Sequence, residues 1–157
     1  MIRQVGPEDW ADWRLLRRRS LTEDPEAFAS SVLIWTGDND TEVRWRARLA
    51  ADACFVAYVD DQPVGMVAGM VGDDGVQLIS MWVAPEARKR GVGRALISAV
   101  IGWSASRPLS LRVVDGNAAA LGAYRQQGFV LQEGCADAEG CRTMVWDRAT
   151  AEREALA

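Results

Sequence analysis

Residues 83–96 read VAPEARKRGVGRAL, and this stretch decides how the chain can fold and act. The apolar run that ends in it, residues 76–83, predicts a strand. A loop of cations and spaced glycines follows, just before an expected helix: Arg88, Lys89, Arg90, Gly91 and Gly93. Glycine lets a backbone turn tightly and approach a ligand closely, and the first N–H groups of a helix carry partial positive charge. The stretch therefore predicts a binding site for a phosphate or pyrophosphate group.

Two common phosphate-binding motifs do not fit this stretch. The sequence lacks the P-loop string Gly-x-x-x-x-Gly-Lys-Ser/Thr, which argues against ATP or GTP bound in that way. The dinucleotide motif Gly-x-Gly-x-x-Gly follows the first strand of its unit. Here the third glycine is replaced by Leu96, past the middle of the chain. The pattern that remains is Arg-x-x-Gly-x-Gly after a strand.

This pattern resembles the acetyl-coenzyme A signature of the GCN5-related N-acetyltransferase (GNAT) family. A second stretch, NAAALGAYRQQGF at residues 117–129, is similar to a later motif of the family, Asn-x-x-Ala-x-x-x-Tyr-x-x-x-Gly-Phe, at every named position. The two motifs occur in the family's order. The resemblance implies an N-acetyltransferase that uses acetyl-coenzyme A.

Composition fits one ordinary globular domain. The chain has 157 residues, 49% hydrophobic and 25% charged. We expect the domain over residues 1–150, with residues 151–157 as a tail that frays from Arg148 onward. The absence of an 18-residue apolar run or an apolar leader predicts a cytoplasmic protein without a membrane partner. The net charge of −4 disfavours nucleic acid as a partner.

Cysteine and histidine usage limits the chemistry. The three cysteines, Cys54, Cys135 and Cys141, are expected to be free thiols, although the last two flank a predicted turn that would allow them to approach each other. No Cys-x-x-Cys pair and no histidine are available for zinc, so no metal site is expected. Acid–base chemistry must then use carboxylates, Tyr, Cys, Lys or water.

Periodicity predicts a mixed α/β fold with a central twisted, mostly antiparallel sheet flanked by helices. The family resemblance implies that this is a GNAT-like single domain. Strands are expected over residues 2–5, 54–59, 63–71, 76–83 and 108–114, with a last hairpin over 129–135 and 141–147. Helices are expected from residue 7, from the cap Asp24 through Phe28, Val32 and Trp35, over 41–51, after the glycine loop, and over 117–127. The helix over 41–51 has two alternative apolar faces, one formed by Val43, Ala47 and Ala50 and the other by Trp45 and Leu49.

The family resemblance implies where the cofactor lies. Main-chain N–H groups of the loop would hold the pyrophosphate, with added contacts from its cationic side chains; the loop comprises Arg88, Lys89, Arg90, Gly91, Val92, Gly93 and Arg94. A bulge in the preceding strand would separate it from the strand over 108–114, so that pantetheine enters the gap beside Met81, Trp82 and Val83. The Met81 N–H would donate to the acetyl carbonyl oxygen and stabilise the oxyanion.

The second motif contains two further site candidates. Tyr124 matches the tyrosine that protonates the leaving thiolate in relatives, or else its ring only packs against the core. Asn117 either bonds the cofactor arm or caps its helix.

The general base is missing from its usual place. Gln77 stands where many family members have Glu, and it cannot usefully accept a proton. Glu26, Glu133 and a water chain remain as candidates. By resemblance to small bacterial relatives, the acceptor cleft is expected to involve Glu26, Phe28, Trp35 and Ser80.

The interpretation of the sequence is direct attack of a primary amine on the thioester in a ternary complex. The acceptor is expected to be a small amine such as a polyamine, an amino acid or an antibiotic, and a homodimer is expected by family resemblance. The alternatives are transfer to a protein N-terminus or lysine, transfer of a longer acyl group or to a hydroxyl, and a coenzyme A-binding module without turnover. Gln77 favours the module, and Tyr124 speaks against it.

Overall fold

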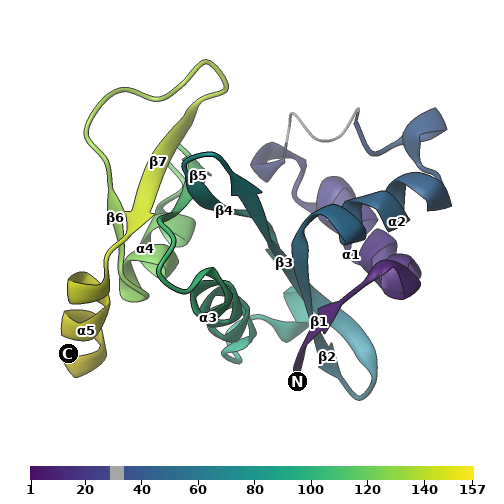
Figure 1. The fold of residues 1–157 in the computed structure, drawn as a ribbon, viewed down its shortest axis with the longest axis horizontal. Coiled ribbons are helices and arrows are strands. Elements are labelled where there is room, and N and C mark those ends of the chain that lie inside the picture. Colours follow the sequence, from purple (N-terminus) through teal and green to yellow (C-terminus); the bar gives the residue numbers. More distant parts are fainter. Residues whose placement is uncertain (29–33) are drawn as a thin grey trace.

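One sheet with helices on both faces forms the frame of the molecule (Figure 1). The structure, a computed structural model, describes residues 1–28 and 34–157. The strand order within these residues is β1-β2-β3-β4-β5-β7-β6. The strands are β1 Ile2–Val5, β2 Ala53–Val59, β3 Gln62–Gly72, β4 Gly75–Val83, β5 Leu109–Val114, β6 Phe129–Leu131 and β7 Cys141–Trp146. Neighbours are antiparallel except for the parallel pair β4 and β5, which confirms the predicted fold class.

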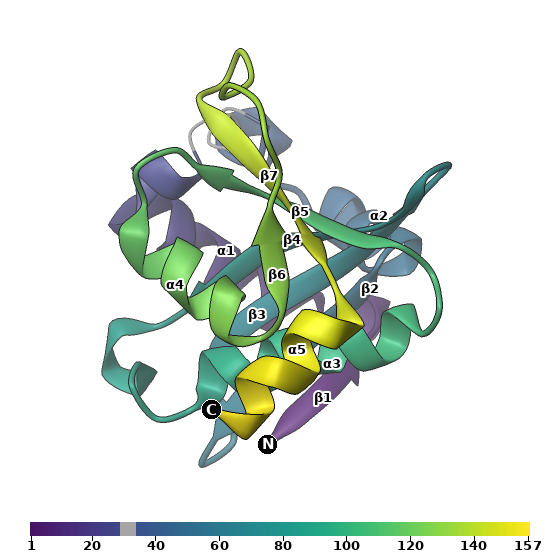
Figure 2. The same ribbon diagram turned by 90° about the vertical axis from the view of Figure 1, so that its left-hand side faces the viewer.

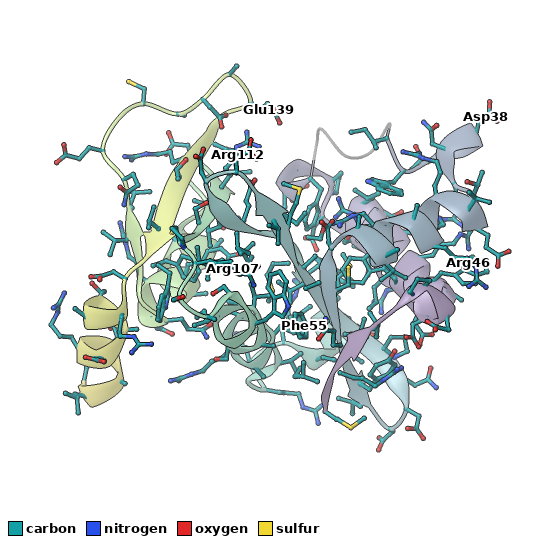
Figure 3. The ribbon with its side chains drawn as sticks, viewed as in Figure 1. Asp38, Arg46, Phe55, Arg107, Arg112 and Glu139 are labelled. Atoms are coloured by element: carbon teal, nitrogen blue, oxygen red, sulfur yellow. The ribbon has the colours of Figure 1, made fainter. Side chains whose placement is uncertain are left out.

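The helices divide between the two faces of the sheet. They are α1 Trp10–Glu23, α2 Glu42–Ala51, α3 Val92–Ser104, α4 Ala118–Gln126 and α5 Arg148–Leu156. Strand β2 shows why both faces are covered, because alternate side chains point to opposite sides. Phe55 packs into the core under α3, whereas Cys54 and Val56 pack into a second core with α1 and α2 (Figures 1 and 3).

The structure decides which face of the helix over 41–51 is buried. Trp45 and Leu49 are buried in the α1–α2 core, whereas Val43 is 78% exposed. The Thr41 hydroxyl caps α2 by accepting from the Arg44 N–H. Because Trp45 also donates its indole N–H to Asp40 at 2.7 Å, the larger ring is buried with its polar group satisfied.

The predicted helix from Asp24 is wrong. The chain forms a single 3₁₀ turn at Pro25–Ala27, and Asp24 makes no capping bond to it. The Asp24 carboxylate instead accepts from Trp82 Nε1 at 2.7 Å and Arg88 Nη2 at 2.9 Å, contacts that only the tertiary fold provides. Val32 lies outside the described residues.

The C-terminal segment is also more ordered than expected. Residues from Arg148 form α5 rather than a frayed tail, and Asp147 caps it by accepting from the Thr150 N–H. Figure 2 shows α5 in front of the sheet, and its Ala151 packs directly on Gly128. The hairpin strand β6 is shorter than the predicted strand over 129–135, because it ends at Leu131. Among the described helices, none is long and apolar enough to cross a membrane.

Candidate functional site

Strand β4 contains the bulge that the family resemblance implied. The ladder with β3 pairs Ala68 with Ile79 but Met66 with Trp82. Two residues of β4, Ser80 and Met81, therefore stand opposite one residue of β3. Ser80 has a φ of +56°, a left-handed conformation that is uncommon for a residue with a side chain. A bulge bends its strand and redirects the side chains around it.

Beyond the bulge, β4 and β5 separate. They pair in parallel over residues 76–78 and 109–111, and then β4 continues to Val83 and β5 to Val114. Two cavities lie at this separation, of about 820 Å³ and about 800 Å³. We call the first the loop-side cavity, because it is lined by Arg88, Gly93 and Arg94. We call the second the α1-side cavity, because it is lined by Arg17 of α1.

The two cavities meet around a small set of shared residues. Both are lined by Glu26, Ala27, Phe28, Met81, Val114, Asn117, Ala120 and Tyr124. Met81 belongs to the bulge and Tyr124 to α4, so the junction lies between the separated strand and the helix of the second motif. Molecules bound in the two cavities would therefore face each other beside Met81 and Tyr124.

The start of α3 leaves its amide groups available. Gly91 is the N-cap with a φ of +81°, and no side chain of the described residues caps the helix. Lys89 is also left-handed, with a φ of +61°. Gly93 allows close packing, because a Cβ there would lie 3.3 Å from Met81 Cε. This geometry leaves positive helix-terminal N–H groups unopposed by any acidic residue in the first turn.

The loop residues differ in what they contact. Arg88 is held in place, because Nε donates to the Val83 carbonyl and Nη2 to Asp24, both at 2.9 Å. The lining of the loop-side cavity also includes Trp82 and Val83, but not Lys89, Arg90, Gly91 or Val92.

Tyr124 packs against the core and also lines both cavities. Its ring packs edge-on against Phe129, with centroids 5.7 Å apart, and belongs to the core under α3. Burial raises the pKa of the Tyr124 phenol above its usual value, so it is protonated at neutral pH. The described residues offer its hydroxyl no hydrogen-bond partner. Proton donation by this hydroxyl to a departing thiolate stays a prediction.

Asn117 caps its helix. Its Oδ1 accepts from the Ala120 N–H at 3.2 Å, the capping alternative left open by the sequence. A bond from Asn117 to a cofactor stays a prediction.

The residues considered for the general base differ in which cavity they line. Gln77 and Ser80 line the α1-side cavity, and the Ser80 hydroxyl accepts from Arg48 Nη2 at 3.2 Å. Glu26 is exposed and lines both cavities. Glu133 lies beyond the end of β6 and is not among the lining residues of either cavity.

The predicted acceptor residues line the α1-side cavity. Phe28 lies under the Arg17 guanidinium, 4.8 Å from ring centroid to Cζ. Trp35 stacks on Trp45 with centroids 4.5 Å apart. The structure thus brings Phe28, Trp35 and Ser80 to one cavity, and the binding of an acceptor there stays a prediction.

Several polar residues of this cavity were missed by the sequence analysis: Arg17, Arg48, Asp52, Arg112 and Glu139. Arg17 belongs to a run of three arginines, which is typical of a solvated helix face. A signal was nevertheless present, because Arg17 stands four residues after Trp13 and one after Leu16, on the buried stripe of α1. At the far end of the cavity, Arg112 of β5 lies beside Glu139, with a nitrogen–oxygen distance of 3.7 Å (Figure 3).

The three cysteines are free, and Cys141 lines the α1-side cavity. Among the described residues, no group of three or more His, Cys, Asp or Glu side chains is placed to hold a metal ion.

Comparison with known proteins agrees with this architecture. Residues 10–129 match the model of the acetyltransferase (GNAT) family. An uncharacterised N-acetyltransferase of Escherichia coli K12, YafP, is 27% identical over 128 residues, which cover 82% of this chain and 79% of that protein. The chain is also 40% identical to mycothiol acetyltransferase of Clavibacter michiganensis over 56 residues, but these span 36% of this chain and 18% of that protein.

Among solved structures, PaiA N-acetyltransferase from Thermoplasma acidophilum, crystallised with coenzyme A, has a TM-score of 0.75 at 15% identity, covering 94% of this chain and 98% of that one. The family match covers most of the chain, and the fold, the bulge and both motifs agree with it. The chain belongs to the GNAT family of N-acetyltransferases, whose acyl donor is acetyl-coenzyme A.

Proposed function

We propose that this protein transfers the acetyl group of acetyl-coenzyme A directly to the primary amine of a small molecule while both are bound. The observation that carries the proposal is the pair of cavities that meet at Met81 and Tyr124. One cavity adjoins the glycine loop, and the other lies against α1. Holding two reactants at such a junction makes the reaction effectively unimolecular, which alone accelerates it strongly.

The residues of the loop side fit coenzyme A. The uncapped start of α3 offers amide donors to a pyrophosphate. The cations Lys89, Arg90 and Arg94 add charge of the matching sign. The main chain of residues 81–83 runs along the opened edge of β4, where an extended pantetheine arm can pair with it. Acetyl-coenzyme A, when bound, supplies an activated thioester.

Three residues at the junction have proposed chemical roles. The Met81 N–H stabilises the negative charge that develops on the carbonyl oxygen, a kind of contact worth about 3 kcal/mol in other enzymes. The Tyr124 hydroxyl donates a proton to the departing sulfur. Glu26, which lines both cavities, accepts a proton from the substrate ammonium directly or through water, and the neutral amine that results attacks the thioester.

The test is an assay of free thiol release with acetyl-coenzyme A and a panel of polyamines, amino acids, aminoglycosides and peptides with free N-termini. We expect release with one class of small amine and saturable heat on titrating acetyl-coenzyme A. Release with peptides alone would replace the small-molecule acceptor by a protein N-terminus or lysine. Absence of both thiol release and acetyl-coenzyme A binding would refute the proposed acetyltransferase activity.

Gln77 supports a second candidate, a coenzyme A-binding module without turnover. Its amide lines the α1-side cavity where many relatives have a carboxylate. Tight binding of acetyl-coenzyme A without thiol release from any acceptor would favour this candidate. The cytoplasmic location and the homodimer stay predictions; light scattering of the purified chain tests the second.

A further inference from the structure

Within the described part of the chain, Arg17 is a buried cation without an acidic partner. It is 5% exposed, and its Nη1 is buried without a hydrogen-bond partner in the described residues. Burial, and next the charge of Arg48, lower the pKa of Arg17 to about 10, so the guanidinium still carries its charge at neutral pH. A buried charge is costly unless it is paired.

Among the arginines that line the α1-side cavity, Arg17 alone has no acidic partner within the described residues. Two other arginines line the α1-side cavity, and each has an acidic partner: Arg48 pairs with Asp52, and Arg112 with Asp137 at 2.7 Å. The Arg17 guanidinium lies over the Phe28 ring, with Cζ 4.8 Å from the ring centroid, a cation–π contact that uses none of its N–H donors.

We propose that the acceptor is an amine that also carries a carboxylate, and that this carboxylate pairs with Arg17 in the α1-side cavity. The inference rests on the proposed function and narrows its substrate class. The planar guanidinium matches the geometry of a carboxylate and can bind it through two parallel hydrogen bonds. With the acid held at α1, the amine end of the molecule points toward the junction at Met81 and Tyr124.

The same charges disfavour polyamines as acceptors. A polyamine has no group that pairs with Arg17, and it would bring cations near both Arg17 and Arg48. Amino acids and short ω-amino acids satisfy the buried cation and present a primary amine. Their length sets how far the amine reaches, so the preferred chain length is itself measurable.

The experiment compares amino acids with their amides, which keep the amine and lose the negative charge. The series covers α-, γ- and ε-amino acids. The variants are Arg17→Met, which keeps the apolar stem, and Arg18→Met as a matched control, because Arg18 is on the same helix with its side chain 55% exposed. Free thiol release gives kcat/KM, and calorimetry in the presence of coenzyme A gives Kd for each acceptor.

We expect the wild-type protein and Arg18→Met to prefer the best acid over its amide by at least about 30-fold. In Arg17→Met, that preference should fall to within about 3-fold, while Kd for acetyl-coenzyme A is unchanged and the melting temperature is not lowered. Equal use of acids and amides by the wild-type protein would overturn the inference, and so would a preference that survives in Arg17→Met. If no amine is acetylated, the proposed function fails. The inference then stands or falls on whether acids bind better than amides, and whether Arg17→Met removes that difference.

Discussion

Replacing Gly91 by glutamate tests the position of the pyrophosphate, and the structure separates the effect on folding from the effect on binding. Gly91 has a φ of +81°, and a Cβ added there would meet no atom within 4 Å. The cost to folding is therefore one of backbone conformation, about 1–2 kcal/mol for a residue with a side chain. Gly91→Gln has the same backbone cost and nearly the same shape, so it is the matched control. At the start of α3, the glutamate charge offsets about 0.3–1 kcal/mol of that cost.

Binding should change in the opposite direction. A carboxylate about 7 Å from a diphosphate with two charges, at an effective dielectric constant of about 40, costs roughly 2.4 kcal/mol without screening. At about 10 mM salt, with a Debye length of about 30 Å, roughly 1.9 kcal/mol remains, a factor of about 25 in Kd. At 0.15 M salt the Debye length is about 8 Å, and the factor falls to about 5.

Calorimetry with acetyl-coenzyme A gives the ratio of Kd between Gly91→Glu and Gly91→Gln at both salt concentrations, and thermal unfolding gives their stabilities. We expect the glutamate variant to be the more stable of the two and the weaker binder, with a gap in affinity that narrows as salt is added. Equal dissociation constants at low salt would show that the pyrophosphate does not lie at this loop.

The remaining predictions concern catalysis and stability. Tyr124→Phe should lower kcat by at least about tenfold and leave Kd for acetyl-coenzyme A within about twofold, because it removes a proton donor and keeps the ring; unchanged turnover would mean that Tyr124 only packs. Gly128→Ala should destabilise the fold by about 2–4 kcal/mol in chemical denaturation, because its φ is +103° and the new Cβ would lie 2.5 Å from Ala151 Cβ; a wild-type midpoint would mean that α5 does not dock there. Hydrogen bonds from Arg14 are the main cause that lowers the pKa of Asp40 to about 2. The ionised Asp40 carboxylate therefore stabilises the fold fully above pH 4, and this stabilisation disappears as the pH falls through 2. After allowance for solvent screening, Asp40→Asn should cost about 1 kcal/mol at pH 6 and almost nothing at pH 2, and a pH-independent difference would contradict the ion pair.

The sequence predicted most of the fold because its signals are local. Alternation along β2, the short polar turns around it and the spacing of buried residues on α1 each depend on a few neighbouring positions. The glycine loop belongs to the same class, because Gly91 needs a left-handed conformation that glycine adopts freely. The second motif likewise placed α4 and its cap Asn117 within one residue of the structure.

The errors arise from contacts between distant segments. Asp24 was expected to cap a helix, but Trp82 and Arg88, 58 and 64 residues away, use its carboxylate. The last segment reads as a charged, alanine-rich tail, and it becomes an ordered helix where Ala151 meets Gly128. Neither contact has a signature in the residues next to it.

Arg17 illustrates a third kind of departure, in which the local rules are correct but a residue that we propose to bind substrate does not follow them. The buried stripe of α1 calls for an apolar residue there, and an arginine run calls for solvent. The chain places a charge on this stripe, and the bulge at Ser80, with a φ of +56°, is another local cost. Both departures adjoin the α1-side cavity, and both are flanked by well-packed cores on either face of the sheet. Strained conformations and buried charges of this kind are retained where the surrounding packing keeps them in place and ligand binding depends on them. On this argument, Arg17→Met should bring the helix closer to the local rule and raise stability as it removes selectivity, a pairing that a purely structural arginine would not show.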